Sequence, residues 1–153
     1  MILRYEKTRL GVKAPSRSNP SDAGLDVFYC PSTTDSSPLT VGPGESVVLE
    51  TGLRFEVPHG FMLEVKNRSS MASKKQLLVG ACVIDPGYSG EVFINLHNVS
   101  MRPQMIAPGD KIAQLVLLPV YHFQCQEEPS GTIYNRPVCI SDRGEGGFGS
   151  TGS

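Results

Sequence analysis

One turn in the middle of the chain has the residue types of a hydrolytic site. Residues 80–91 read GACVIDPGYSGE, so Asp85 directly precedes a Pro-Gly turn signal between two apolar stretches. Taken alone, Asp85 is explained more simply as an Asx-type turn residue. The chemical interpretation is a carboxylate on a rigid hairpin, which acts as a general base for water. Tyr88 would then pack flat against a sugar, and a ribose 2′-hydroxyl would collide with its ring.

The C-terminal segment is a second candidate, because residues 143–153 read RGEGGFGSTGS. Glycines at this density exclude a stable strand or helix, so we expect a mobile arm; a disordered end without function is the alternative. Arg143 offers a planar fork for phosphate oxygens, and Phe148 is a lone aromatic that could stack on a base. Ser150 and Thr151 offer hydroxyls, and the glycines let backbone N–H groups wrap an anion. The spacing is not that of a Walker loop.

Three shorter segments combine charged or polar groups with turn signals. Arg68, Ser69 and Ser70 stand at the start of a possible helix, where they could bind an anion. A capping serine beside a surface arginine explains the same residues equally well. Asp26 and Gln114 each follow a glycine-containing turn, and a turn beside a core strand accounts for either one alone.

The elements that would position these groups are short strands. The 153 residues include 16 Gly and 12 Pro, an excess that argues against long helices and favours strands and turns. One short helix is expected within 69–76, with serines as its N-caps. Strands are predicted at 46–51, 53–57, 61–66, 91–99 and 111–120. Their regular spacing predicts an all-β sandwich or barrel.

Charge and cysteine content exclude several classes of protein. Fourteen basic and 15 acidic residues give a net charge of -1, which argues against a nucleic-acid binder that works by bulk positive charge. The four cysteines form no CxxC pair, so we expect reduced thiols and no zinc site. The start, MILRYEKTRL, has no apolar stretch of a secretory signal, and 112–120 is too short to span a bilayer. We therefore expect a cytoplasmic protein without a membrane partner, or one of the host cytoplasm or nucleus for a viral chain.

The five segments occur in the order and spacing of one family, and the chain resembles the trimeric deoxyuridine triphosphate nucleotidohydrolases (dUTPases). The similar motifs are AGLDV at 23–27, RSSMA at 68–72, GACVIDPGYSGE at 80–91, GDKIAQL at 109–115 and RGEGGFGSTG at 143–152. The third and fifth are the most specific. The resemblance implies a distorted jelly-roll β-barrel at 1–142 and a flexible Gly-rich arm at 143–153. It also implies a homotrimer whose active sites are shared between subunits.

The activity that the resemblance implies is hydrolysis of dUTP to dUMP and pyrophosphate with Mg²⁺, which clears dUTP from the nucleotide pool and supplies dUMP for dTMP synthesis. Asp85 would activate the water that attacks the α-phosphorus, and Asp26 would assist through the water shell of Mg²⁺. The implied substrate-binding residues are Cys82, Val83, Ile84 and Phe93 for uracil, Tyr88 for deoxyribose, Arg68, Ser69, Ser70 and Gln114 for the phosphates, and Arg143, Phe148, Gly149 and Ser150 in the closing arm.

The chain departs from the common family pattern at Asn67, Ser70, Cys82 and Ser89, none of which removes a catalytic group. A dCTP deaminase-like activity is one alternative, but Asn95 stands where that chemistry needs a glutamate to move the proton. A non-catalytic, dUTP-binding regulatory protein is the other alternative. Pyrophosphate release from dUTP would separate it from the enzyme.

Overall fold

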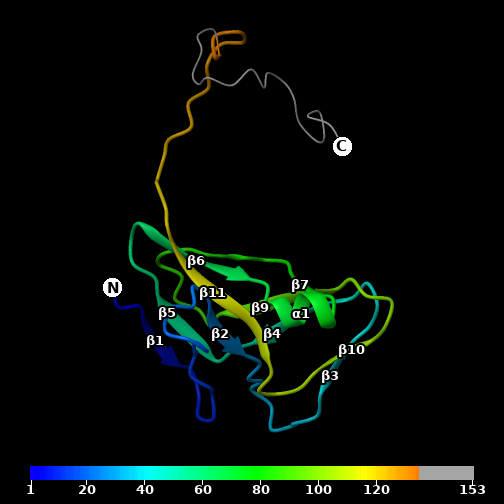
Figure 1. Ribbon diagram of the computed structural model, residues 1–153. Helices are drawn as coiled ribbons and strands as arrows, with labels where there is room; N and C mark the ends of the chain where they lie inside the picture. The colour runs from blue at the N-terminus through cyan, green and yellow to red at the C-terminus, as the bar shows by residue number, and fades with distance from the viewer. Residues whose placement is uncertain (135–153) are drawn as a thin grey trace. The chain divides into compact units, whose positions relative to one another are not determined.

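The strands and the helix lie in one compact unit, Met1–His122, of the residues 1–134 that the computed structural model describes. Residues 123–134 belong to a second unit and contain no strand or helix. The predicted arm at 143–153 and its boundary at 142 lie outside the described residues. Figure 1 shows the elements, which are β1 (Arg4–Lys7), β2 (Leu25–Phe28), β3 (Leu39–Val41), β4 (Ser46–Glu50), β5 (Leu53–Glu56), β6 (Phe61–Lys66), α1 (Ser69–Lys74), β7 (Leu77–Val79), β8 (Val83–Ile84), β9 (Phe93–Asn98), β10 (Gln104–Ile106) and β11 (Lys111–Pro119).

The strands of residues 1–134 pair into four sheets, and every pairing is antiparallel. The largest sheet has the order β2-β11-β6-β8, and the next has the order β4-β9-β7. Two-stranded sheets join β1 to β5 and β10 to β3. The predicted all-β class with one short helix is confirmed. Within this range, no helix has the length and apolar character that a membrane span requires.

Alternating apolar side chains supply the core. In β9, Ile94 and Leu96 are fully buried whereas Phe93 and His97 are exposed, as the sequence pattern predicts. The largest fully buried side chains are Leu49, Leu53, Leu63, Leu77, Ile94, Leu96, Ile106, Ile112 and Leu115. They come from all four sheets, so one core holds the sheets together, at about 1.5–3 kcal/mol for each fully buried side chain.

The turn at Pro86-Gly87 joins two sheets. Gly87 has a φ of 86°, and the Tyr88 N–H donates to the Asp85 carbonyl at 3.3 Å, so the predicted turn is present. The strand before it, β8, pairs with β6, whereas β9 after it pairs with β4 and β7. The predicted hairpin is therefore wrong, because a local pattern of apolar residues predicts strands without specifying which neighbour each strand finds.

The predicted helix is present as α1, but its cap differs from the prediction. Arg68 is the N-cap residue, in an extended conformation, and no side chain caps the helix. Ser69 already lies in the first turn, where its carbonyl accepts a hydrogen bond from the Ser73 hydroxyl at 2.7 Å. The predicted serine cap is wrong; Met71, the buried residue of α1, anchors the helix on the core instead.

Candidate functional site

Three of the predicted motifs meet at one polar cavity of about 320 Å³. The pairing of β2 with β11 places Asp26 opposite Gln114, and β6 places Lys66 on the other side of Gln114. Arg68 follows β6 by two residues and reaches back to Asp26. The cavity is lined by Ser18, Asp22, Ala23, Gly24, Asp26, Arg68, Ser69 and Gln114. The fold thus brings together four residues that the sequence predicted for this site: Asp26, Arg68, Ser69 and Gln114.

The carboxylate of Asp26 lies between two cations. Its Oδ1 accepts a hydrogen bond from Arg68 Nε at 2.8 Å, and its Oδ2 lies 2.7 Å from Lys111 Nζ. The Asp26 side chain is only 11% exposed, and a carboxylate so little exposed requires such partners. Arg68 also donates from Nη1 to the Ser70 hydroxyl at 3.2 Å. Sequence reasoning missed Lys111, although it stands in the GDK turn of the fourth motif.

Gln114 is held in place by the backbone of the second motif. Its Nε2 donates to the Asn67 carbonyl at 2.8 Å, and the Asn67 side chain accepts from the Val79 N–H at 2.7 Å. A Cβ at Gly24 would lie 1.8 Å from Gln114 Oε1, so glycine permits this close approach. Asn67, noted in the sequence as a departure, therefore ties the loop before α1 to β7.

The predicted base lies at a second, smaller cavity of about 200 Å³. Asp85 is exposed there beside Tyr88 and Phe93, which are 46% and 45% exposed. Val83 and Ile84 of β8 complete the lining together with Val92. Because β8 is the edge strand of its sheet, the backbone groups that face away from β6 are open to a ligand. Cys82 lies outside the lining, and its carbonyl accepts from the Val65 N–H at 2.7 Å.

Tyr88 is fixed against its own turn. Its hydroxyl donates to the Glu91 carbonyl at 2.8 Å. A Cβ at Gly90 would lie 2.5 Å from that hydroxyl oxygen, so the phenol rests directly on glycine. The hydrogen bond and the contact with Gly90 hold the Tyr88 ring in one orientation.

Glu91 anchors the end of the same turn, and sequence reasoning assigned it no role. Its Oε2 pairs with Arg9 Nη1 at 2.9 Å, and its Oε1 accepts from the Gly52 N–H at 2.7 Å. The Glu91 side chain is 14% exposed. Next to it, the Thr51 hydroxyl donates to the Val92 carbonyl at 2.5 Å. The Asp85 turn is therefore fastened to the N-terminal segment and to the start of β5.

Asn95 is held by structural hydrogen bonds. Its Nδ2 donates to the Val47 carbonyl at 3.2 Å, and its Oδ1 lies 3.0 Å from His97 Nε2. A side-chain amide neither gains nor loses a proton as an acid or base near neutral pH. Asn95 is therefore unsuited to shuttle a proton.

The two cavities share no lining residue and involve opposite edges of one sheet. β2 carries Asp26, and β8 ends directly before Asp85; these strands are the two edges in the order β2-β11-β6-β8. Asp85 follows Ile84, which pairs with Leu63, whereas Arg68 lies five residues beyond Leu63, so the two are separated by roughly 17 Å along the direction of β6. One chain therefore does not bring Asp85 together with Arg68. Arg143, Phe148, Gly149 and Ser150 lie outside the described residues.

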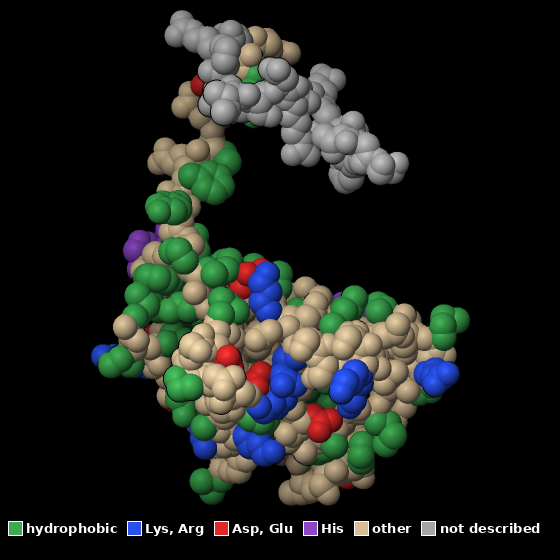
Figure 2. Space-filling view, in the orientation of Figure 1, with side chains coloured by type: hydrophobic (Ala, Val, Ile, Leu, Met, Phe, Trp, Pro, Cys, Tyr) green, Lys and Arg blue, Asp and Glu red, His purple; other side chains and the backbone are tan. Residues whose placement is uncertain are grey.

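Basic side chains gather on the face that carries the Asp26 cavity. Figure 2 shows Lys and Arg in blue over β2 and β11, around acidic side chains in red. Lys13 and Lys111 both lie over the Phe28 ring, with Nζ at 5.2 and 6.0 Å from its centroid. Of these two lysines, Lys111 pairs with Asp26 beside the cavity, whereas Lys13 donates to the Gly109 carbonyl.

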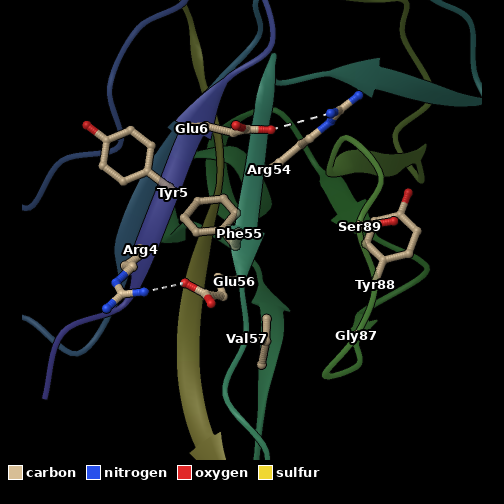
Figure 3. A pocket seen from close by; sticks show the side chains of 10 residues that line it. All are labelled: Arg4, Tyr5, Glu6, Arg54, Phe55, Glu56, Val57, Gly87, Tyr88 and Ser89. Carbon is tan, nitrogen blue, oxygen red and sulfur yellow. Dashed lines mark hydrogen bonds and ion pairs between the residues drawn. The ribbon is translucent and has the colours of Figure 1, made fainter.

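A third cavity, of about 500 Å³, shares Tyr88 with the Asp85 cavity and is larger than either candidate. Figure 3 shows its charged residues paired with each other: Arg4 with Glu56 and Arg54 with Glu6, each at 3.3 Å, beside the rings of Tyr5 and Phe55. Tyr88 is the one predicted site residue in its lining. Because its charges pair off, this cavity is a poor candidate for a polyphosphate.

Comparison with known proteins identifies the family. The dUTPase family model matches residues 11–152. The deoxyuridine 5′-triphosphate nucleotidohydrolase of Anaplasma marginale is 35% identical over 149 residues, which cover 94% of this chain and 91% of the relative. The protein of the same name from Gloeobacter violaceus is 36% identical over 140 residues, covering 90% and 88%.

Solved structures agree in fold. A mutant dUTPase of Staphylococcus bacteriophage 80alpha with dUpNHpp has a TM-score of 0.77 at 23% identity, covering 99% of each chain. A mutant dUTPase of phage phi11 of S. aureus, described for its coordination of a structural Mg(II) ion, has a TM-score of 0.74 at 24% identity, covering 84% of this chain and 97% of the other. With the family model matched over nearly the whole sequence and relatives above 30% identity, the chain belongs to the dUTPase family.

Proposed function

We propose that this chain hydrolyses dUTP to dUMP and pyrophosphate. The observation that carries the proposal is the cavity where Asp26, Arg68, Ser69 and Gln114 meet, in a chain of the dUTPase family. Curated relatives are named for this hydrolysis. The cavity offers a guanidinium, a hydroxyl and an amide to the oxygens of a triphosphate.

The phosphates would bind to groups that the fold already orients. Arg68 is aligned through Nε by Asp26 and through Nη1 by Ser70, which leaves Nη2 for a phosphate oxygen. Ser69 is exposed at the same cavity, and Gln114 lies opposite Asp26. Such preorganisation reduces the ordering that binding must otherwise impose.

The base and sugar would bind at the Asp85 cavity. The backbone of Cys82, Val83 and Ile84, with Phe93, would read the edge of uracil, and the methyl of thymine would find no room there. A methylene-sized difference gives only about 1–3 kcal/mol in a soft pocket, so this selection needs a rigid wall. Tyr88, resting on Gly90, is such a wall for the deoxyribose, where a 2′-hydroxyl would collide.

In the proposed reaction, Asp85 accepts a proton from water as the water oxygen attacks the α-phosphorus. A bond forms from that oxygen to the α-phosphorus, and the bond to the bridging oxygen of the β-phosphate breaks, releasing pyrophosphate. The turn at Pro86-Gly87 and the anchor at Glu91 keep the carboxylate on a stable platform.

The proposed reaction uses Mg²⁺. Within residues 1–134, no group of three or more His, Cys, Asp or Glu side chains is placed to hold a metal ion, and both Asp26 oxygens have cationic partners. These observations fit a Mg²⁺ ion that is held mainly by phosphate oxygens and water, as is usual for this ion. Asp26 would contact the water shell of the ion. When bound, the ion would neutralise charge on the triphosphate.

Assembly of copies would complete the site. Because the two cavities involve opposite edges of one sheet, we propose a homotrimer in which Asp85 of one copy faces the Arg68 cavity of the next.

Mixed trimers test this arrangement. Asp85→Asn and Arg68→Ala are each expected to be nearly inactive, whereas co-assembly of the two in equal amounts restores activity. An intact site forms where a copy that keeps Asp85 adjoins a copy that keeps Arg68. Random assembly of equal amounts gives this combination at about one site in four, so roughly a quarter of the wild-type turnover returns. Rates are measured before and after unfolding and refolding of the mixture, with each variant refolded alone as the control. Sites built from a single chain would give no recovery.

The proposed activity is tested by incubating the protein with Mg²⁺ and dUTP, dTTP, dCTP or UTP in parallel. Pyrophosphate release is expected from dUTP, at rates well above those from the other three nucleotides. Ammonia release from dCTP would instead identify the deaminase-like alternative, against which Asn95 argues. Binding of dUTP without turnover would identify a non-catalytic regulatory protein.

A further inference from the structure

A break in the regular pairing of β11, as a β-bulge produces, decides which of its side chains lie on the same face as Asp26. The pairing with β2 is Gln114–Asp26, Ala113–Val27 and Lys111–Phe28, with a shift between Lys111 and Ala113. Ile112 and Ala113 are successive residues and both are fully buried, as expected where a bulge turns two neighbours to one face. Strict alternation would put Lys111 on the opposite face from Gln114, three positions away. The bulge returns Lys111 to the face of Asp26.

Lys111 makes its contact with Asp26 and does not line the cavity itself. Its Nζ lies 2.7 Å from Asp26 Oδ2 and 6.0 Å from the centroid of the Phe28 ring. Its side chain is 33% exposed, so the ion pair is partly shielded from solvent. The opposite oxygen, Oδ1, holds Arg68 Nε at 2.8 Å. Asp26 therefore connects Lys111 to the guanidinium that lines the cavity.

The charges of this triad show what Lys111 adds. Arg68 and Asp26 alone sum to zero, so their pairing would cancel the charge that a triphosphate needs. With Lys111 the three groups sum to +1. The second cation also occupies Oδ2, so Asp26 holds Arg68 through Oδ1 alone.

We propose that Lys111 is a positioning residue for polyphosphate binding, which acts through Asp26 to keep Arg68 oriented and to offset the negative charge of Asp26 beside the cavity. This inference rests on the proposed phosphate-binding role of the cavity. It concerns affinity for the phosphate chain and leaves the attack on the α-phosphorus to Asp85.

The test compares Lys111→Met with Lys13→Met. Lys13 is a matched control because it lies over the same Phe28 ring but makes its hydrogen bond to the Gly109 carbonyl instead of Asp26. Calorimetry with inorganic tripolyphosphate measures binding without turnover, and steady-state rates with dUTP give KM and kcat. Lys111→Met is expected to weaken tripolyphosphate binding and raise KM by roughly tenfold, with kcat changed far less. The difference from wild type should shrink at high salt.

The conservative variant Lys111→Arg should restore affinity, and Lys13→Met should resemble the wild type. Lys111→Gln is a second neutral variant for the case that the methionine variant unfolds. Equal losses in both lysine variants, or a fall in kcat without a change in affinity, would overturn the proposal, as would failure of the wild type to bind tripolyphosphate. If the protein binds tripolyphosphate in a Lys111-dependent way but does not hydrolyse dUTP, the proposed function is refuted and the inference about Lys111 stands.

Discussion

Asp85→Asn is expected to lower kcat for dUTP by about 10²–10⁴-fold while nucleotide binding survives. Asparagine keeps the size of the side chain and cannot accept the proton from water. The turn itself should persist, because it depends on Gly87, on the backbone hydrogen bond from Tyr88 and on the Glu91 anchor. Pyrophosphate release measures turnover, and titration with dUpNHpp measures binding without hydrolysis.

A matched control for this variant is Asp35→Asn. Asp35 is an exposed carboxylate in the polar loop after β2, where hydrogen bonds from the Ser37 side chain and backbone lower the pKa of Asp35. It lines neither candidate cavity, so its amide variant should turn over dUTP like the wild type. Comparable kcat values for Asp85→Asn and the wild type would remove Asp85 from the role of base.

Deletion of residues 143–153 is expected to leave a folded assembly with a kcat/KM lowered by roughly 10²–10⁴-fold. The deletion removes Arg143 and Phe148, and a charged hydrogen bond and a base–aromatic stack each contribute about 1–3 kcal/mol. Closure of such an arm would also exclude water from the reacting phosphate. The core should be unaffected, since the buried core residues found within 1–134 lie between Val12 and Leu115.

Three measurements separate the explanations of a loss. Activity with dUTP gives kcat/KM, size-exclusion chromatography gives the assembly, and thermal unfolding gives the stability of the fold. Arg143→Ala and Phe148→Ala divide the effect between phosphate and base. Loss of the assembly on deletion would make the segment structural, and full activity would remove it from the site.

The strands of the core were predictable because their patterns are local. β6 was predicted to the residue, and β9 has the alternation of buried and exposed side chains that the sequence shows. The serine cap of α1 was predicted wrongly, because residue type alone does not say which backbone position adopts the extended conformation; Arg68 does so. The hairpin predicted at Asp85 is wrong for a related reason, since β8 pairs with β6, from which α1 and β7 separate it in the chain.

By itself, the sequence determined the all-β class, the single helix and the motifs that carry Asp26, Arg68, Asp85 and Gln114, because these are properties of residue type, spacing and local periodicity. Tertiary structure alone decided two further features. The strand order β2-β11-β6-β8 places Asp26 on one edge strand of the sheet and Asp85 directly after the other, so the two candidate cavities are separate within one chain. The bulge in β11 breaks strict alternation and brings Lys111 to Asp26, because a side chain's face depends on register with the neighbouring strand and not on its position in the sequence.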